Sequence, residues 1–194
     1  MTDVRNSIVP SDACASREAG SFLAQLDDQL RRLTENTRDL TADDLAWQPA
    51  PGMNTIGMLL AHLAIVEVFW TQYGVLGETP DVAPVLGIGL DDDGMPLKAG
   101  MEPPAPLAGR DLAFFDDLLA RARAHAGGVL ARMKEADFER TFERTRPDGT
   151  TVALNVRWVV YHILEHFAGH YGQVLLLRHQ RRSALAEAAA RGVR

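Results

Sequence analysis

The chain of 194 residues has little cysteine and no excess of positive charge. Its single cysteine, Cys14, excludes an internal disulfide and suits a protein of the reducing cytoplasm, where we expect it to reside. The 20 Lys and Arg residues are outnumbered by 26 Asp and Glu residues, which gives a net charge of −6. Because nucleic-acid-binding proteins depend on clustered positive charge, this balance argues against a nucleic acid partner.

Targeting, membrane and nucleotide-binding signals are also missing. Residues 1–6 lack the basic start of a signal peptide and are not followed by its apolar core. The uncharged stretch 45–66 is long enough to cross a bilayer, but its prolines and glycine favour a loop that leads into a buried amphipathic helix. The glycines at 87–89 lack the third glycine of a dinucleotide loop. Residues 91–94 (DDDG) lack calcium-loop spacing, and we interpret them as a solvated acidic turn.

The composition, 46% hydrophobic and 24% charged, is typical of a globular protein, so we expect a single domain over residues 1–194. Four long stretches have apolar residues at helical spacing, namely residues 15–40, 55–76, 111–136 and 156–181. This pattern predicts an all-α four-helix bundle, a fold that builds its polar sites from side chains on facing helices.

The connections between the predicted helices differ in character. Residues 77–109 are rich in proline and glycine and predict a long irregular excursion. Residues 138–155 surround a Pro-Asp-Gly turn at 147–149 and predict a short β-hairpin. Three arginines between residues 178 and 182 are expected to end the last helix, where they would complement its dipole, and the alanine-rich residues after Ser183 are expected to extend or fray this end.

The last predicted helix carries His162, His166 and His170, each four residues from the next. Neighbours at this spacing lie on one face, about 6 Å apart along the axis, and can both reach one metal ion. The outer two histidines lie about 12 Å apart, which is too far for them to share an ion. A single site therefore uses either His162 with His166 or His166 with His170, and the spacing leaves both options open.

The second predicted helix offers His62 on its apolar stripe, between Leu59 and Leu63. A lone histidine on such a face is usually a hydrogen-bonded core residue. A four-helix bundle would, however, place His62 opposite the histidine ladder, by which we mean His162, His166 and His170 of the last helix. Three imidazole ligands, with no cysteine as a fourth ligand, leave one position of a tetrahedral metal ion open. An open position of this kind is typical of catalytic metal sites. Such ligands suit zinc, nickel, copper or iron. His125 and His179 have no such company, and we interpret them as surface residues.

A rival pattern overlaps the same helix. His162, Glu165 and His166 fit the inverted zinc-protease motif H-x-x-E-H, in which the glutamate is the general base and both histidines are ligands. Such proteases also need an acidic third ligand well downstream, and beyond His166 only Glu187 follows. This reading is therefore the weaker of the two.

Three motifs, in order, resemble the DinB-like superfamily, including its mycothiol-dependent maleylpyruvate isomerase-like branch. The first is the sequence WQPAPGMN at residues 47–54, which is similar to the W-x-P-x-P-G-x-S entry to the second helix. The second is the histidine-bearing sequence LAHL at residues 60–63, and the third is the H-x-x-x-H-x-G-Q pattern at residues 166–173. Together the motifs span a core of about residues 20–180.

The resemblance implies an up-down-down-up four-helix bundle that is often a homodimer. It also implies a divalent metal ion, for which zinc or nickel is the favoured candidate, held by His62, His166 and His170. Of the two histidine pairs that the spacing leaves open, the resemblance thus selects His166 with His170. His162 would then either support a metal ligand without binding the ion itself or lie next to the open coordination position.

We expect a metal-dependent enzyme of the transferase or isomerase type that uses a low-molecular-weight thiol, with His162 or Glu67 moving protons. The first alternative is a metal-dependent hydrolase with Glu67 or Glu165 as the base. The others are a non-enzymatic metal-binding stress-response module and a helical dimer with structural histidines. In each enzyme case the partner is a small-molecule substrate, and no membrane is involved.

Overall fold

The computed structural model describes residues 7–95, 102–146 and 148–192; Pro147 of the expected hairpin turn, part of the excursion and the first six residues lie outside this range. The long helices are α1 (Arg17–Thr37), α3 (Ile56–Trp70), α5 (Leu112–Leu130) and α6 (Val156–Gly192). The shorter elements are α2 (Ala42–Ala46), the π-helix η1 (Thr71–Leu76), α4 (Ala83–Leu86), and the 3₁₀ helices η2 (Ala105–Leu107) and η3 (Glu135–Glu139).

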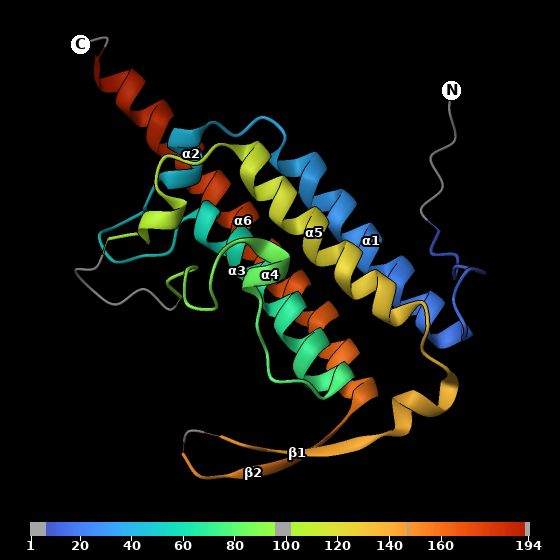
Figure 1. Ribbon diagram of the computed structural model, residues 1–194. Helices are drawn as coiled ribbons and strands as arrows, with labels where there is room; N and C mark the ends of the chain where they lie inside the picture. Colours follow the sequence, from blue (N-terminus) through green and yellow to red (C-terminus); the bar gives the residue numbers. More distant parts are fainter. Residues whose placement is uncertain (1–6, 96–101, 147, 193–194) are drawn as a thin grey trace, which may run out of the picture.

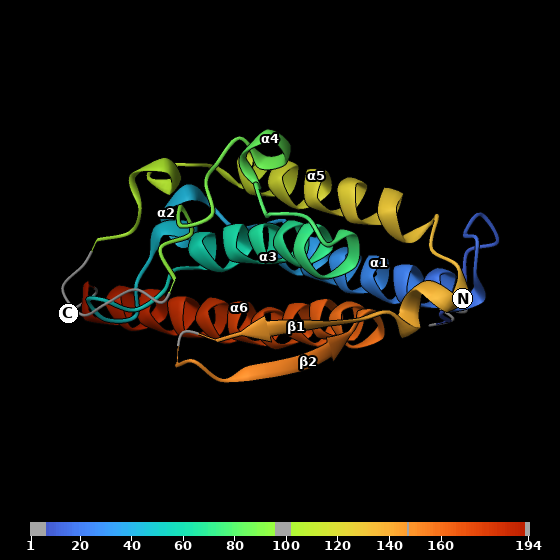
Figure 2. The ribbon, with the colours of Figure 1, turned by 60° about the horizontal axis from the view of Figure 1, so that its bottom comes forward.

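The four long helices lie side by side, and each contacts two others (Figures 1 and 2). Both α1 and α3 pack against α5 and α6. The chain is thus mostly helical, as expected, with one small two-stranded sheet. The helix expected over 111–136 ends earlier, at Leu130, and η3 follows it.

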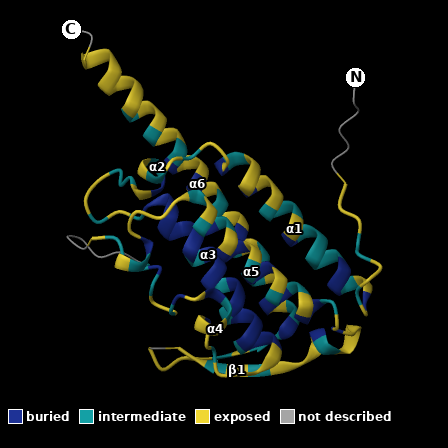
Figure 3. Ribbon diagram, turned by 45° about the horizontal axis from the view of Figure 1, so that its top comes forward, coloured by how far each residue is buried: buried dark blue, intermediate teal, exposed yellow. Residues whose placement is uncertain are grey.

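Helix α3 runs through the middle of the molecule and is buried on most of its circumference (Figure 3). The expected amphipathic stripe is therefore wrong in part, because residues on several sides of this helix, such as Leu60 and Ile65, are buried as well. Four partly covered residues recur at helical spacing and form one face: His62, Val66, Phe69 and Tyr73. His62 thus occupies the least covered face of the core helix.

The segment Ile56–Leu76 has the length and apolar composition of a membrane span, and 72% of its most apolar window is buried inside the protein. Core helices of soluble proteins have the same composition, so this feature is weak evidence for a membrane protein. The contacts of α3 with α5 and α6 account for its apolar surface.

The expected β-hairpin is confirmed. Strands β1 (Thr141–Thr145) and β2 (Thr151–Asn155) pair antiparallel, with Thr141 opposite Asn155. Its inner face meets the end of the α3 region, where Phe142 lies edge-on to Tyr73 and the Arg144 guanidinium lies 4.9 Å from the centre of the Trp70 ring.

The arginine cluster does not end the last helix, because α6 continues to Gly192 through an alanine-rich sequence of high helix propensity. The arginines instead pair with the segment that follows α1. Arg178 and Arg182 each bind a carboxylate oxygen of Asp39, and Arg181 binds Asp44 in α2. These ion pairs fasten the second half of α6 to the α1–α2 connection.

The described residues of the excursion over 77–109 are more ordered than its composition predicts. Val82, Leu86 and Ile88 are buried in the main core, and α4 packs against α3 and α5. The turn after Ile88 closes when the Asp92 carboxylate accepts a hydrogen bond from the Gly89 N–H. The excursion thereby lies along α3 next to His62.

Candidate metal centre

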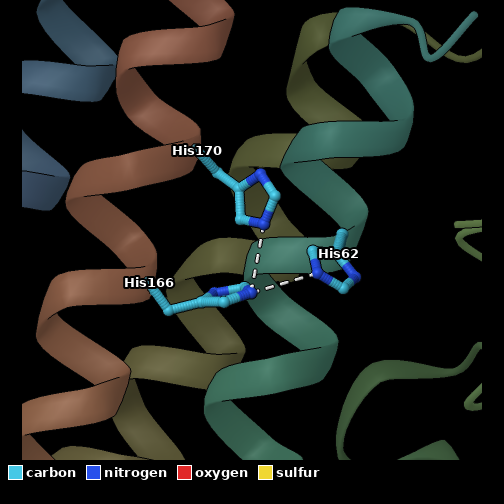
Figure 4. A group of neighbouring side chains, drawn as sticks. All are labelled: His62, His166 and His170. Atoms are coloured by element: carbon cyan, nitrogen blue, oxygen red, sulfur yellow. Dashed lines mark hydrogen bonds between the residues drawn. The ribbon is translucent and has the colours of Figure 1, made fainter. Parts of the chain in front are cut away.

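Three histidines converge between α3 and α6 (Figure 4). His62 comes from the partly covered face of α3, whereas His166 and His170 lie one turn apart on α6. The Nε2 atom of His166 lies 3.2 Å from Nε2 of His62 and 3.1 Å from Nε2 of His170. One potential ligand atom from each of the three residues lies within 4.8 Å of those of the other two.

These separations fit one metal ion. Zinc–nitrogen bonds of 2.0–2.1 Å in a tetrahedron place two ligand nitrogens about 3.4 Å apart, close to the two observed distances. His166 and His170 reach the centre from α6 and His62 reaches it from the facing α3, and these three ligands leave one position of a tetrahedral ion for a further ligand.

The positions of the protons on the three imidazole rings also favour a metal ion. His62 Nδ1 lies 2.7 Å from Asp93 Oδ2 and His170 Nδ1 lies 2.9 Å from Gln173 Oε1, so each Nδ1 acts as a donor. In neutral rings, the Nε2 atoms of His62 and His170 then carry lone pairs, and only His166 can place a proton between them. Three converging nitrogens therefore share at most one proton, which suits a cation better than a hydrogen-bond network.

Burial keeps two of these rings uncharged. Burial is the main cause that lowers the pKa of His166 from 6.5 to about 3, and the charges that His170, His62 and His162 can carry contribute to the same shift. Burial also lowers the pKa of His170, against a hydrogen bond to Gln173 that raises it. At neutral pH both rings offer the lone pairs that a metal ion requires.

The acidic turn at residues 91–94 was misjudged from the sequence. Asp93 is buried, with a relative exposure of 5%, and its carboxylate holds His62. No local signal distinguishes it from Asp91 and Asp92, because 31 residues separate it from its partner. Carboxylate–histidine pairs of this kind orient metal-binding rings.

His162 lies beside the three converging histidines rather than among them. Its ring stacks on Trp158 with centroids 4.8 Å apart, touches Trp70 edge-on at 5.1 Å, and lies 5.7 Å from the His166 ring. Its Nδ1 pairs with Glu165 Oε1 at 3.0 Å. Trp158 also lines a cavity of about 400 Å³ that opens beside the β-hairpin.

Glu67 points away from the histidines. Five residues after His62 on α3, it lies about 140° around the helix, where the Arg123 guanidinium binds both of its carboxylate oxygens, at 2.7 and 3.1 Å. Glu67 is 2% exposed, and Arg123 also binds Asp27. The expected role of Glu67 beside the metal is therefore replaced by a buried ion pair between α3 and α5.

The arrangement disfavours the inverted protease motif. That motif would use His162 and His166 as ligands and Glu165 as the free base. In the structure His170 takes the place beside His166, while Glu165 is exposed and bound to His162 and Tyr161.

The remaining candidates lie elsewhere. His179 is exposed, as expected, but His125 is only partly exposed, and its Nε2 atom is buried without a hydrogen-bond partner among the residues that the structure describes. Cys14 precedes α1 and lines a separate cavity near the N-terminal segment. Cys14 is not one of the residues grouped at the metal centre.

Comparison with known proteins adds a family and a fold. A sequence model described as the DinB superfamily matches residues 25–174. A crystal structure of a conserved protein from Enterococcus faecalis superposes with a TM-score of 0.60 at 16% identity, over 82% of this chain and 94% of that chain. At this identity the likeness concerns the fold alone. A search of curated proteins gives no significant match.

Proposed function

This chain belongs to the DinB superfamily, and on that premise we propose that it is a metal-dependent enzyme that uses a low-molecular-weight thiol. His62, His166 and His170 would hold the ion, with zinc or nickel as the favoured metal. The observation that carries the proposal is the convergence of three Nε2 atoms that share at most one proton. A divalent ion there would supply a Lewis acid that favours the thiolate form of a thiol at neutral pH.

The chain's own residues suggest how a thiol would be handled. Because the His162 Nδ1–H faces Glu165, the neutral ring presents its Nε2 lone pair as a proton acceptor. The stack on Trp158 fixes the ring plane, so this atom would take the thiol proton in a fixed direction. The electrophile would lie toward the Trp158 cavity, whose volume suits a small molecule.

An external thiol is required because the chain's only cysteine lies outside the histidine cluster. Within the superfamily we propose a place near the mycothiol-dependent isomerase-like branch, on the strength of the three sequence motifs. A hydrolase is the competing function, with exposed Glu165 as its base, and it would turn over without any thiol.

Three further proposals complete this picture. The mutual contacts of α1, α3, α5 and α6 support an up-down-down-up bundle. The exposed apolar side chains Tyr161, Leu175 and Leu176 on α6 support a homodimer, which sedimentation of the wild type and of Leu176→Glu would test. The single cysteine supports a cytoplasmic location.

The test uses protein purified without a histidine tag, stripped with a chelator and reloaded with zinc or nickel. A panel of small thiols is offered with a chromogenic aryl halide, and product formation is followed by absorbance. We expect activity that requires both metal and thiol, is lost in His166→Gln, and is retained in the matched control His179→Gln. Metal-dependent turnover without thiol would favour the hydrolase, and no turnover with any thiol would refute the proposal.

A further inference from the structure

The excursion between α3 and α5 reaches the metal centre through one buried carboxylate. Asp93 Oδ2 lies 2.7 Å from His62 Nδ1, whereas His62 Nε2 faces His166 on the opposite edge of the ring. The carboxylate is therefore directed at the ring and away from the point where the three Nε2 atoms meet. Asp93 can orient a ligand there, but it is not itself placed as one.

The backbone around Asp93 is built to hold that position. Its second oxygen, Oδ1, accepts a hydrogen bond of 2.9 Å from the Met95 N–H, so both carboxylate oxygens are engaged. Gly94 follows in the left-handed region at a φ of 65°, and a Cβ on this residue would clash with the ring of Pro104. Only glycine fits this turn without displacing the neighbouring aspartate.

We propose that Asp93 is a positioning residue that couples the excursion to metal binding. By accepting the Nδ1 proton of His62, it keeps the Nε2 lone pair directed at the other two histidines. In the other direction, an ion on Nε2 polarises the ring and strengthens the Nδ1–H donor, which holds the turn 89–95 more firmly against α3. This inference rests on the proposed metal site and deepens it.

The coupling has a quantitative consequence. Binding linkage is reciprocal, so the factor by which the Asp93–His62 contact raises metal affinity equals the factor by which metal favours that contact. Partners that orient a metal-binding histidine typically change affinity about 10–100-fold. Zinc should therefore slow amide exchange in the turn 89–95 of the wild type, whereas Asp93→Ala should show no zinc-dependent slowing there.

The first experiment measures zinc affinity by competition with a chromophoric chelator. Asp93→Ala removes both hydrogen bonds, and we expect about 100-fold weaker binding. Asp93→Asn keeps the size but has one acceptor oxygen for two donors, and we expect about 10-fold weaker binding. The matched control is Asp91→Asn in the same turn, where the exposed carboxylate forms no hydrogen bond or ion pair with another described residue and affinity should stay within about twofold.

A second variant tests the backbone without changing any polar side chain. Gly94→Ala should displace the turn and weaken zinc binding, because the added Cβ conflicts with Pro104. Circular dichroism and thermal unfolding of every variant would show that the fold is retained. In the metal-free wild type, two-dimensional ¹H–¹⁵N spectra should show the proton of neutral His62 on Nδ1, and in Asp93→Ala it should shift toward Nε2.

The possible outcomes distinguish a failure of the Asp93 coupling from a failure of the metal site itself. If Asp93→Ala loosens the turn but binds zinc as the wild type does, Asp93 has only a structural role and the inference is overturned while the metal site stands. If the wild type itself binds no divalent metal, the proposed function fails and the coupling fails with it. Weaker binding in Asp93→Ala and Gly94→Ala, with the Asp91→Asn control unchanged, would support the coupling.

Discussion

Helix α3 carries two polar side chains into the helical core, and their surroundings are opposites. Glu67 meets the Arg123 guanidinium, which binds both of its oxygens, so its buried negative charge has a positive partner. His62 meets two other imidazoles whose nitrogens face one another with a shared deficit of protons. The first cluster is complete by itself, whereas the second is one that, in our proposal, a cation would complete.

The comparison separates structural from functional polar groups in a protein interior. A buried ion pair with every oxygen engaged offers nothing further to a ligand, although losing one partner is costly. Converging acceptors that lack donors destabilise the folded state, and a ligand that binds to them stabilises it again. The following predictions test this division, in order of decreasing effect.

The largest effect is expected from breaking the closed cluster. Glu67→Ala leaves the buried Arg123 guanidinium with only the exposed Asp27 as a partner among the described residues, so the free energy of unfolding should fall by about 3–5 kcal/mol. Urea denaturation of the metal-free protein measures this loss, and the folded fraction should bind zinc normally. Asp27→Asn is the exposed control, with an expected loss of about 1 kcal/mol or less. Loss of zinc binding in folded Glu67→Ala would place Glu67 in the metal site after all.

Next in size is the effect of opening the histidine cluster. His170→Ala should weaken zinc binding by about 3–4 kcal/mol, roughly the share of one ligand in a protein zinc site. His162→Ala, on the same helix, removes a ring that stacks on Trp158 but lies outside the three converging nitrogens, and it should change affinity less than about 10-fold. The reverse ranking in a zinc competition titration would revive the H-x-x-E-H arrangement.

A smaller effect is expected from pH. The pKa of His166 is lowered to about 3 in the folded protein, so the unfolded chain binds the extra proton as pH falls below 6.5. The free energy of unfolding of the metal-free protein should therefore fall as the pH is lowered from 7.5 to 5. We expect a loss of only about 1 kcal/mol, because the His166 ring is partly exposed and solvent screens part of the effect. Hydrogen bonds to arginine hold the pKa of Asp39 and Glu18 low, so these carboxylates stay ionised in this window.

His166→Gln should flatten this part of the stability profile, measured by denaturant titration at each pH. An unchanged slope in His166→Gln would show that the ring is not held in its neutral form by burial.

The smallest effect is expected at the surface, where charges are paired in water. Arg182→Ala removes an exposed partner of Asp39, while Arg178 still binds that carboxylate, so stability should change by less than about 1 kcal/mol. Thermal unfolding at low and high salt would measure it. A loss of stability as large as that of Glu67→Ala would show that the ion pairs between α6 and Asp39 stabilise the fold as much as the buried pair of Glu67 and Arg123.

The helices and the histidine ladder could be read from the sequence because their signals are local. Apolar spacing marked the long helices, and the four-residue spacing of His162, His166 and His170 placed them on one face. The choice between the two histidine pairs needed the position of His62, which depends on how α3 packs against α6.

What the sequence could not supply were partners distant along the chain. No residue near Glu67 in the sequence indicates that Arg123, 56 residues later, binds it, and its place five residues after His62 made a role beside the metal look plausible. Asp93 was likewise judged by its acidic neighbours, although a buried contact with His62 decides its environment. The role of the arginines in α6 was misjudged, because they pair with Asp39 and Asp44 instead of ending the helix, which continues through the alanine-rich residues.

The central claim is that the three converging histidines form a metal site. Its most direct test is a zinc titration of tag-free, chelator-stripped protein, followed by calorimetry and by elemental analysis after gel filtration. We predict one ion per chain in the wild type and none retained in His62→Ala/His166→Ala, with this double variant still folded. Retention of no ion by the wild type, or of equal metal by the double variant, would contradict it.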